Sequence, residues 1–332
     1  MKKLIVFLGT FYFLFFIPTV TNAQTSVVNI AEPYSFVDFQ NDVWQLKNKY
    51  KDNIQIETIG TSEYGRKIYA IKLGNGRKNV LMIGAHHGRE WITSLMLMKM
   101  VENYVSSPIP TNQLDDISVW FVPMLNPDGI TIQQGDLQKF PIFAKKTIKR
   151  MNNDSSDFSR WKSNAMGVDL NRQYPSGWNE LNETSGMPSY KNYKGKQPLE
   201  AKEVKAIVQF TKKINPLIAV SYHATGQEIF WEYKNGDNLK RDKQIAERIA
   251  DSTGYKLSVP KKDAIGGGYT DWFIQQYHLP ALTIEICPLV EESNPPLSTF
   301  AEEWKRNKEV LNILANEAKR INKTHKNIRT NK

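Results

Sequence analysis

The sequence predicts an α/β fold, with a mixed, largely parallel central sheet flanked by helices in a single domain. Short apolar runs alternate with helix-like segments, as in folds whose buried strands are covered on both faces. The 332 residues show no internal repeat and no composition break, and 40% of them are hydrophobic, which is enough for one large core. These observations exclude disordered, collagen-like and disulfide-rich classes of protein.

The first elements are placed by the spacing of their apolar residues. Residues 43–50 begin a helix. Residues 54–59 and 67–73 alternate apolar and polar positions around a turn at residues 63–65, which predicts an edge hairpin. Buried strands are expected at residues 79–85, 117–125, 217–222 and 281–286. Ligands of such sheets bind outside the carboxyl ends of the strands.

Helices are expected between these strands, at residues 91–105, 199–213 and 239–253. A last helix opens with Thr299 and Glu302 at capping-box spacing and runs to about residue 321. Residues 130–165 and 173–198 show little periodicity and are expected to be long loops that shape a binding site.

Residues 1–23 have the pattern of a secretory signal peptide, which leaves residues 24–332 as the mature domain. Lys2 and Lys3 precede an apolar run at residues 4–17, and a small-residue cleavage site ends at Ala23. The run is shorter than the roughly 20 residues that span a bilayer, so an uncleaved membrane anchor is the weaker alternative. The mature chain is therefore expected to be secreted, with no integral membrane segment and a possible association with the cell wall.

Charge and cysteine content restrict the partners and the chemistry. The chain has a formal charge of +10, and loss of the two leader lysines leaves +8, which suits anionic cell-wall polymers. The basic tail consists of Lys319, Arg320, Lys323, Lys326, Arg329 and Lys332. A solvated helix end explains this tail equally well, and no motif supports nucleic-acid binding. The single cysteine, Cys287, excludes a disulfide framework and is expected to be a buried apolar residue, so a metal site would use His, Asp and Glu.

Two histidines and a glutamate stand where predicted strands end. His87 and Glu90 follow the strand at residues 79–85, and His223 follows the strand at residues 217–222. If these strands are neighbours, the three side chains form a His2Glu set, which is typical of catalytic zinc sites. Magnesium and calcium prefer oxygen ligands, so zinc is the expected cofactor. A His-x-x-Glu pair by itself also occurs on ordinary helix surfaces.

The residues around His87 resemble the zinc carboxypeptidase family, typified by carboxypeptidase A. Six segments match its motifs in order, at residues 83–91, 126–129, 167–172, 221–223, 267–272 and 283–285. The resemblance covers about residues 34–316 and implies the single-domain, phosphorylase/hydrolase-like fold of that family. It also implies one Zn2+ held by His87, Glu90 and His223.

Within this resemblance Glu285 is the general base of a peptidase. Zinc lowers the pKa of bound water to about 7, and a facing carboxylate takes that proton and later delivers it to the leaving amine. Without the family, Glu285 would be interpreted as a strand-end carboxylate bonded to backbone. Asp169 is expected to support the ligands by a hydrogen bond, and His86 to point away from the metal.

Further positions match the family's substrate-binding residues. Arg89, Asn171 and Arg172 match residues that bind the carboxylate of the released amino acid, because guanidinium and amide groups suit it. Thr270 matches the floor of the specificity pocket, and it is neither a long apolar residue nor the acid that selects basic side chains.

Two roles have no clear match. The arginine that stabilises the oxyanion is replaced by Lys162 or Arg160, and the choice between them stays open. The mobile tyrosine of carboxypeptidase A falls near Asp263, so its role is vacant or passes to Tyr269.

Residues 158–164, 167–174 and 268–273 look most like the bacterial branch that cleaves peptidoglycan stem peptides between γ-D-glutamate and a diamino acid, commonly meso-diaminopimelate. This resemblance implies a peptidoglycan stem peptide as substrate. The alternatives are a metallocarboxypeptidase of broader specificity on ordinary peptides, a noncatalytic wall-binding module, and a small-molecule amidohydrolase.

Overall fold

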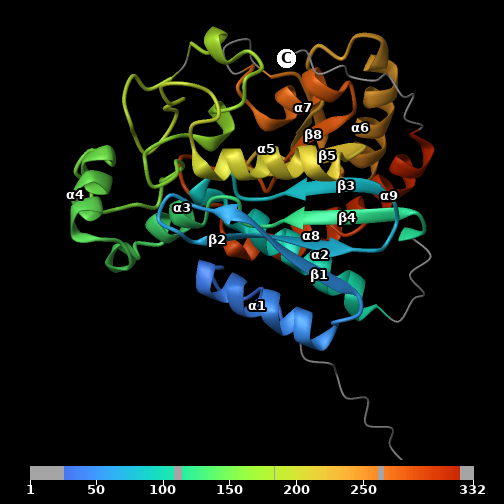
Figure 1. Cartoon of the computed structure of the whole chain (residues 1–332), viewed down its shortest axis with the longest axis horizontal. Coiled ribbons are helices and arrows are strands. Elements are labelled where there is room, and N and C mark those ends of the chain that lie inside the picture. Colours follow the sequence, from blue (N-terminus) through green and yellow to red (C-terminus); the bar gives the residue numbers. More distant parts are fainter. Residues whose placement is uncertain (1–25, 108–113, 183, 261–264, 322–332) are drawn as a thin grey trace, which may run out of the picture.

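The computed structural model describes residues 26–107, 114–182, 184–260 and 265–321. The predicted leader, Asp263 and most of the basic tail lie outside these residues. Within them, none of the helices combines the length and the apolar character of a bilayer-crossing segment. Figure 1 shows a central twisted sheet with helices on both of its faces.

The sheet is mixed, as the sequence predicts. Its strands are β1 (Ile54–Thr61), β2 (Lys67–Leu73), β3 (Lys78–Ile83), β4 (Ile117–Val122), β5 (Ile218–Ala224), β6 (Glu228–Phe230), β7 (Lys256–Ser258) and β8 (Ala281–Ile286). They lie in the order β1-β2-β4-β3-β5-β8-β6-β7. The central strands β4, β3, β5 and β8 are parallel, and β1 pairs with β2 as the expected antiparallel edge hairpin.

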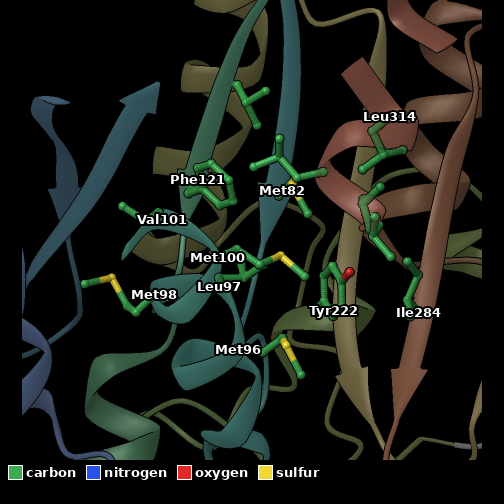
Figure 2. Close-up of a cluster of buried hydrophobic side chains, with 14 of the residues drawn as sticks. Met82, Met96, Leu97, Met98, Met100, Val101, Phe121, Tyr222, Ile284 and Leu314 are labelled. Atoms are coloured by element: carbon green, nitrogen blue, oxygen red, sulfur yellow. The ribbon is translucent and has the colours of Figure 1, made fainter. Parts of the chain in front are cut away.

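Helices cover both faces because strand residues alternate between them. Met82 belongs to a core on the face that is covered by α1 (Phe36–Lys49), α2 (Ile92–Ser106), α6 (Leu239–Thr253), α8 (Phe300–Asn307) and α9 (Val310–Arg320). Leu81 and Ile83 face α5 (Lys202–Ile214) and α7 (Tyr269–Tyr277). Figure 2 shows how Met96, Leu97 and Met100 of α2 approach Tyr222 and Ile284 in the first core. Both faces of β3 and β5 are therefore buried, and only their ends are available for a site.

Three local predictions are wrong. Residues 130–165 are not one long loop, because α3 (Pro127–Gln133) and α4 (Ile142–Met151) lie there. The last helix is two, with a break between Asn307 and Val310. Thr299 is not a capping residue: a 3₁₀ turn already gives it helical angles, and its hydroxyl donates to the carbonyl of Pro296.

Glu203, in the first turn of α5, is a buried carboxyl that links two loops. It accepts hydrogen bonds from the backbone N–H of Glu63 (3.1 Å) and from the side-chain amide of Asn164 (3.2 Å). Burial, reinforced by the negative charge of Asp128, raises the pKa of Glu203 to about 8. The folded state therefore holds a proton that the unfolded chain releases near the ordinary value of 4.5.

This raised pKa predicts a stability that falls with pH. The contribution of the protonated Glu203 is complete below about pH 4.5 and is lost as the pH rises through about 8. Linkage gives an upper limit of about 5 kcal/mol for this loss. The Glu203→Gln variant cannot titrate at this position. Between pH 5 and pH 8.5, urea titrations should therefore show the unfolding free energy of the wild type falling relative to that of the variant. Parallel pH curves for the two proteins would contradict the assignment.

Candidate metal centre and active site

The metal-binding residues meet because β3 and β5 are parallel neighbours. Ile83 at the end of β3 pairs with Ser221 in β5, two residues before His223. The chain leaves β3 and enters a 3₁₀ turn at Gly88–Glu90, which places Glu90 beside His87. Gly88 is required here, because a Cβ atom would collide with the backbone of Gly129. The prediction that neighbouring strands bring the two histidines together is confirmed.

His87, Glu90 and His223 form a buried cluster whose ligand atoms all lie within 4.8 Å of one another. The Nδ1 atoms of the two histidines are 3.2 Å apart. Glu90 reaches both rings, with Oε1 2.8 Å from Nδ1 of His87 and Oε2 3.0 Å from Nδ1 of His223. Two imidazole nitrogens and a carboxylate converging in the interior are the donor set of a tetrahedral zinc site with an open position.

The outer nitrogen of each ring is occupied, and this fixes which nitrogen faces the cluster. Nε2 of His87 lies 3.1 Å from Oδ1 of Asp169, and Nε2 of His223 lies 3.0 Å from the hydroxyl of Ser221. Protons on both Nε2 atoms leave the Nδ1 lone pairs directed at each other, an arrangement that a cation between them stabilises. Burial lowers the pKa of His223, so its ring is neutral, as a metal ligand must be. The residues present therefore fit zinc.

His86 is not one of the metal-binding residues, as expected, but its ring does not point away from them: it stacks on the ring of His223, with 5.3 Å between the ring centroids. Its Nδ1 lies 3.1 Å from the hydroxyl of Ser221, and its Nε2 lies 3.0 Å from the hydroxyl of Tyr174. Burial lowers the pKa of His86 well below its ordinary value, so it is a neutral member of this hydrogen-bond chain. Through Ser221, this series of hydrogen bonds fixes the orientation of the His223 ring on the side away from the metal-binding atoms.

Asp169 joins the metal-binding residues to Lys162. Its second carboxylate oxygen lies 2.8 Å from the ammonium nitrogen of Lys162. Burial alone would raise the pKa of Asp169, but the positive charge of Lys162 holds it well below its ordinary value. The carboxylate therefore stays ionised and keeps Lys162 beside His87, where a developing oxyanion would be stabilised.

Glu285 faces the same space from the next strand. It pairs with His223 in the register of β5 and β8, so their side chains lie on the same face of the sheet. Burial and the negative charge of Glu90 raise the pKa of Glu285 well above its ordinary value. A carboxyl with a raised pKa next to a metal site suits proton transfer.

Two arginines present unsatisfied donors toward this region. Among the described residues, neither Nη1 of Arg89 nor Nε of Arg172 has a hydrogen-bond partner, although both atoms are buried. The carbonyl oxygen of the Asn171 side chain accepts from the backbone N–H of Tyr269 (3.0 Å), which fixes the amide. Buried guanidinium donors without partners indicate an anionic ligand.

Thr270 lies close to the catalytic face of β8. Its hydroxyl is 2.9 Å from that of Thr283, which precedes Glu285 by two residues and therefore shares its face. Two adjacent hydroxyls give this position a small polar surface, in agreement with the expectation that it is neither long and apolar nor acidic.

Two predicted site residues lie elsewhere. Tyr269 is 0% exposed, and its hydroxyl lies 3.0 Å from that of Thr211 of α5, so it cannot take the role of a mobile tyrosine. Arg160 stacks on Tyr190, with its guanidinium carbon 4.0 Å from the ring centroid, and donates to the carbonyl of Asn152. These positions favour Lys162 over Arg160 for the oxyanion role, which stays a prediction.

The contrast between these two cations can be tested. The Lys162→Gln variant should lower kcat about a hundredfold, the typical effect of losing one oxyanion donor. The Arg160→Gln variant removes the same charge two residues away and should keep a kcat close to that of the wild type. Steady-state kinetics on one peptide substrate compare them, and equal losses would contradict the assignment.

Asn126 holds the two halves of the site together, a role that the sequence did not reveal. Its side-chain nitrogen donates to the carbonyl of His86 (3.1 Å) and to the carbonyl of Ser163 (3.2 Å), and its oxygen accepts from the N–H of Gly129. The turn that contains the metal-binding residues and the loop that contains Lys162 are thus joined through one buried amide. The turn motif at residues 126–129 was visible in the sequence, but its partners are 40 and 37 residues away.

The Asn126→Asp variant should therefore damage both stability and catalysis. The new carboxylate oxygen would face two carbonyls, at a cost of about 1–3 kcal/mol in unfolding free energy. Asn152 is a matched control, because its buried amide also donates to two carbonyls, those of Ser155 and Asp157. Asn152→Asp should lose similar stability in urea titrations without the weaker zinc binding and lower kcat expected for Asn126→Asp. Equal zinc affinity in the two variants would exclude this role.

A buried His2Glu set facing a carboxylate defines a mononuclear metallohydrolase on an α/β sheet. The chain belongs to the zinc carboxypeptidase family, whose model matches residues 41–310. It is 30% identical over 286 residues to gamma-D-glutamyl-L-diamino acid endopeptidase 1 of Lysinibacillus sphaericus, over 82% of this chain and 70% of that protein. These findings confirm the resemblance, and the chain is a zinc metallopeptidase.

More distant relatives agree on the fold. The chain is 27% identical over 236 residues to carboxypeptidase A1 of Sus scrofa, an alignment that covers 69% of this chain and 53% of the pig protein. It therefore spans about half the length of that relative. The structure of bovine thrombin-activatable fibrinolysis inhibitor in complex with tick carboxypeptidase inhibitor has a TM-score of 0.70 and 19% identity, covering 88% of this chain and 99% of that one. This likeness confirms the predicted fold class.

Proposed function

We propose that this zinc metallopeptidase acts outside the cell on peptidoglycan stem peptides, at the bond between γ-D-glutamate and a diamino acid. The observation that carries the proposal is its identity of 30% to a Lysinibacillus sphaericus protein named for that activity. The free guanidinium donors of Arg89 and Arg172 add support, because stem peptides have carboxylates on both sides of this bond.

The residues of the site have distinct tasks in this reaction. Arg172 and Asn171 bind a substrate carboxylate, and Lys162 places a positive charge where the carbonyl oxygen becomes negative. Glu285 takes a proton from the attacking water and returns it to the departing amine. His87, Glu90 and His223 would hold the zinc ion, which would supply a lowered pKa for bound water and polarisation of the carbonyl group.

Purified stem peptides and ordinary peptides, each incubated with zinc-loaded protein, test the substrate by mass spectrometry. We expect cleavage between γ-D-glutamate and the diamino acid. Stepwise removal of C-terminal residues from ordinary peptides alone would instead favour a metallocarboxypeptidase of broader specificity, the second candidate, which the 27% identity to carboxypeptidase A1 supports. Binding of wall material without any cleavage would favour the noncatalytic module.

Export is a separate part of the proposal and rests on residues 1–23. Protein recovered from the culture medium of a bacterial host should begin at Gln24 when its N-terminus is sequenced. Retention of residues 1–23 in a membrane fraction would favour the uncleaved anchor. An association with anionic wall polymers is part of the same proposal and rests on the positive charge of the chain. Of the basic tail, Lys319 and Arg320 lie within the described residues.

A further inference from the structure

Helix α4 lies at the edge of the molecule, beyond the carboxyl ends of β3 and β4 (Figure 1). The side of α4 that faces the protein is apolar and consists of three buried residues. Ala144, Ile148 and Met151 pack in a small satellite core with Phe158 and Trp161. This core holds α4 on the segment that leads directly to Lys162, so α4 is a fixed part of the catalytic end.

The outer side of α4 is strongly basic and contains no acidic residue. Its cations are Lys145, Lys146, Lys149 and Arg150. Among the described residues, none of these four takes part in an ion pair, whereas nearby Lys139 is paired with Asp136. Four cations on three turns repel one another, and a surface anion that binds them would relieve this repulsion.

Two large apolar residues begin the same helix and face solvent. Ile142 is 72% exposed and Phe143 is 68% exposed, although Ala144 beside them is buried. Single exposed apolar residues are ordinary, but here an adjacent pair lies on the same exposed side as the cations, and apolar burial together with attraction to anionic lipids is what binds a protein surface to a membrane interface. A soluble polyanion would neutralise the cations and leave this pair in water, whereas an anionic bilayer accommodates both.

We propose that α4 docks the protein onto an anionic lipid bilayer. Ile142 and Phe143 enter the boundary between headgroups and acyl chains, and the four cations contact lipid phosphates. Because α4 lies beyond the carboxyl ends of β3 and β4, docking would bring this end of the sheet close to the bilayer (Figure 1). This proposal stands on α4 alone and does not depend on which peptide bond the enzyme cleaves.

A reporter on α4 tests docking locally. Cys287 is the only cysteine and is buried, so a Thr147→Cys variant can be labelled selectively with an environment-sensitive dye on the exposed surface of α4. Its emission should shift to the blue with phosphatidylglycerol vesicles and stay unchanged with phosphatidylcholine vesicles. A label at Lys240→Cys, on exposed α6, should not shift with either lipid. This local readout separates docking by α4 from any binding by residues 1–23.

Matched variants separate the two contributions. Changing all four cations of α4 to glutamine should weaken binding to phosphatidylglycerol vesicles, measured by sedimentation, about a thousandfold. The control removes four other exposed lysines, Lys205, Lys212, Lys240 and Lys308, and should bind like the wild type.

The apolar pair is tested separately. The Ile142→Ser, Phe143→Ser variant should weaken binding about tenfold. Its control, Val259→Ser with Met187→Ser, removes two equally exposed apolar residues and should bind like the wild type.

Three results would overturn the proposal. The first is the absence of a dye shift at residue 147 with phosphatidylglycerol vesicles. The second is an equal loss of binding in the variants and their controls, which would make the attraction a property of the net charge. The third is full vesicle binding by the Ile142→Ser, Phe143→Ser variant together with equally tight binding of soluble teichoic acid, which would assign α4 to a wall polymer.

Discussion

The Glu285→Gln variant should lower kcat roughly a thousandfold, within the range typical for loss of a general acid–base group. Glutamine keeps the size of the side chain but can neither take a proton from water nor return it to the leaving amine. Glu285 is not among the metal-binding residues, so zinc content and unfolding temperature should stay near the wild-type values. Steady-state kinetics, metal analysis and thermal unfolding on one preparation measure all three.

Glu228 supplies a matched control for this variant. It pairs with Glu285 across β6 and β8, but its carboxylate accepts from the hydroxyl of Ser258 (2.6 Å) and pairs with Lys256. Glu228→Gln removes the same charge from the neighbouring strand and should change kcat far less. If both variants lose activity equally, the effect belongs to the charge of the strand pair, and Glu285 is not the base.

The central part of the site could be predicted because it depends on strand order. His87 and His223 follow apolar runs that only buried strands explain, and the carboxyl ends of parallel neighbours share one edge. Asp169 was foreseen for a similar reason, since a histidine ligand needs a partner for its second nitrogen. Secondary-structure periodicity and ligand chemistry were sufficient for these positions.

The remaining positions depend on contacts that a pattern does not encode. Arg160 and Lys162 are two residues apart and both cationic, and only the burial of Asp169 beside one of them distinguishes their roles. Tyr269 follows a glycine-rich turn, as a cleft residue would, yet α7 starts there and directs the ring into the core. Asn126 acts through carbonyl groups, which have no sequence signature.

Helix α4 was missed although its signal was present. Ala144, Ile148 and Met151 have the i, i+4, i+7 spacing of a helix face, but only three apolar positions in ten residues pack inward. Its two other large apolar residues, Ile142 and Phe143, are exposed and blur the period. Apolar residues that face solvent instead of the core weaken the apolar periodicity from which a helix is predicted.

Loss of the metal is the second large effect that we expect. The Glu90→Gln variant replaces a charged ligand by a neutral amide and leaves the two Nδ1 atoms, 3.2 Å apart, without the carboxylate that joins them. Zinc content should fall to near zero, and peptide cleavage to the rate of chelator-treated wild type. Chelation of the wild type should be reversed by added zinc, whereas Glu90→Gln should stay inactive.

Stability reports the same binding without any assay of catalysis. A ligand at a hundred times its Kd adds about 2.7 kcal/mol to the unfolding free energy of a protein that binds it only when folded. Zinc at that level should stabilise the wild type and Glu285→Gln by this amount and leave Glu90→Gln unchanged. Asp169→Asn, which keeps all three metal-binding residues but removes the charge that His87 and Lys162 share, should fall between them, with an affinity about 10- to 100-fold weaker. Equal stabilisation of all four proteins would place the bound zinc elsewhere, because the three side chains at the ends of β3 and β5 would then have no measurable part in holding it.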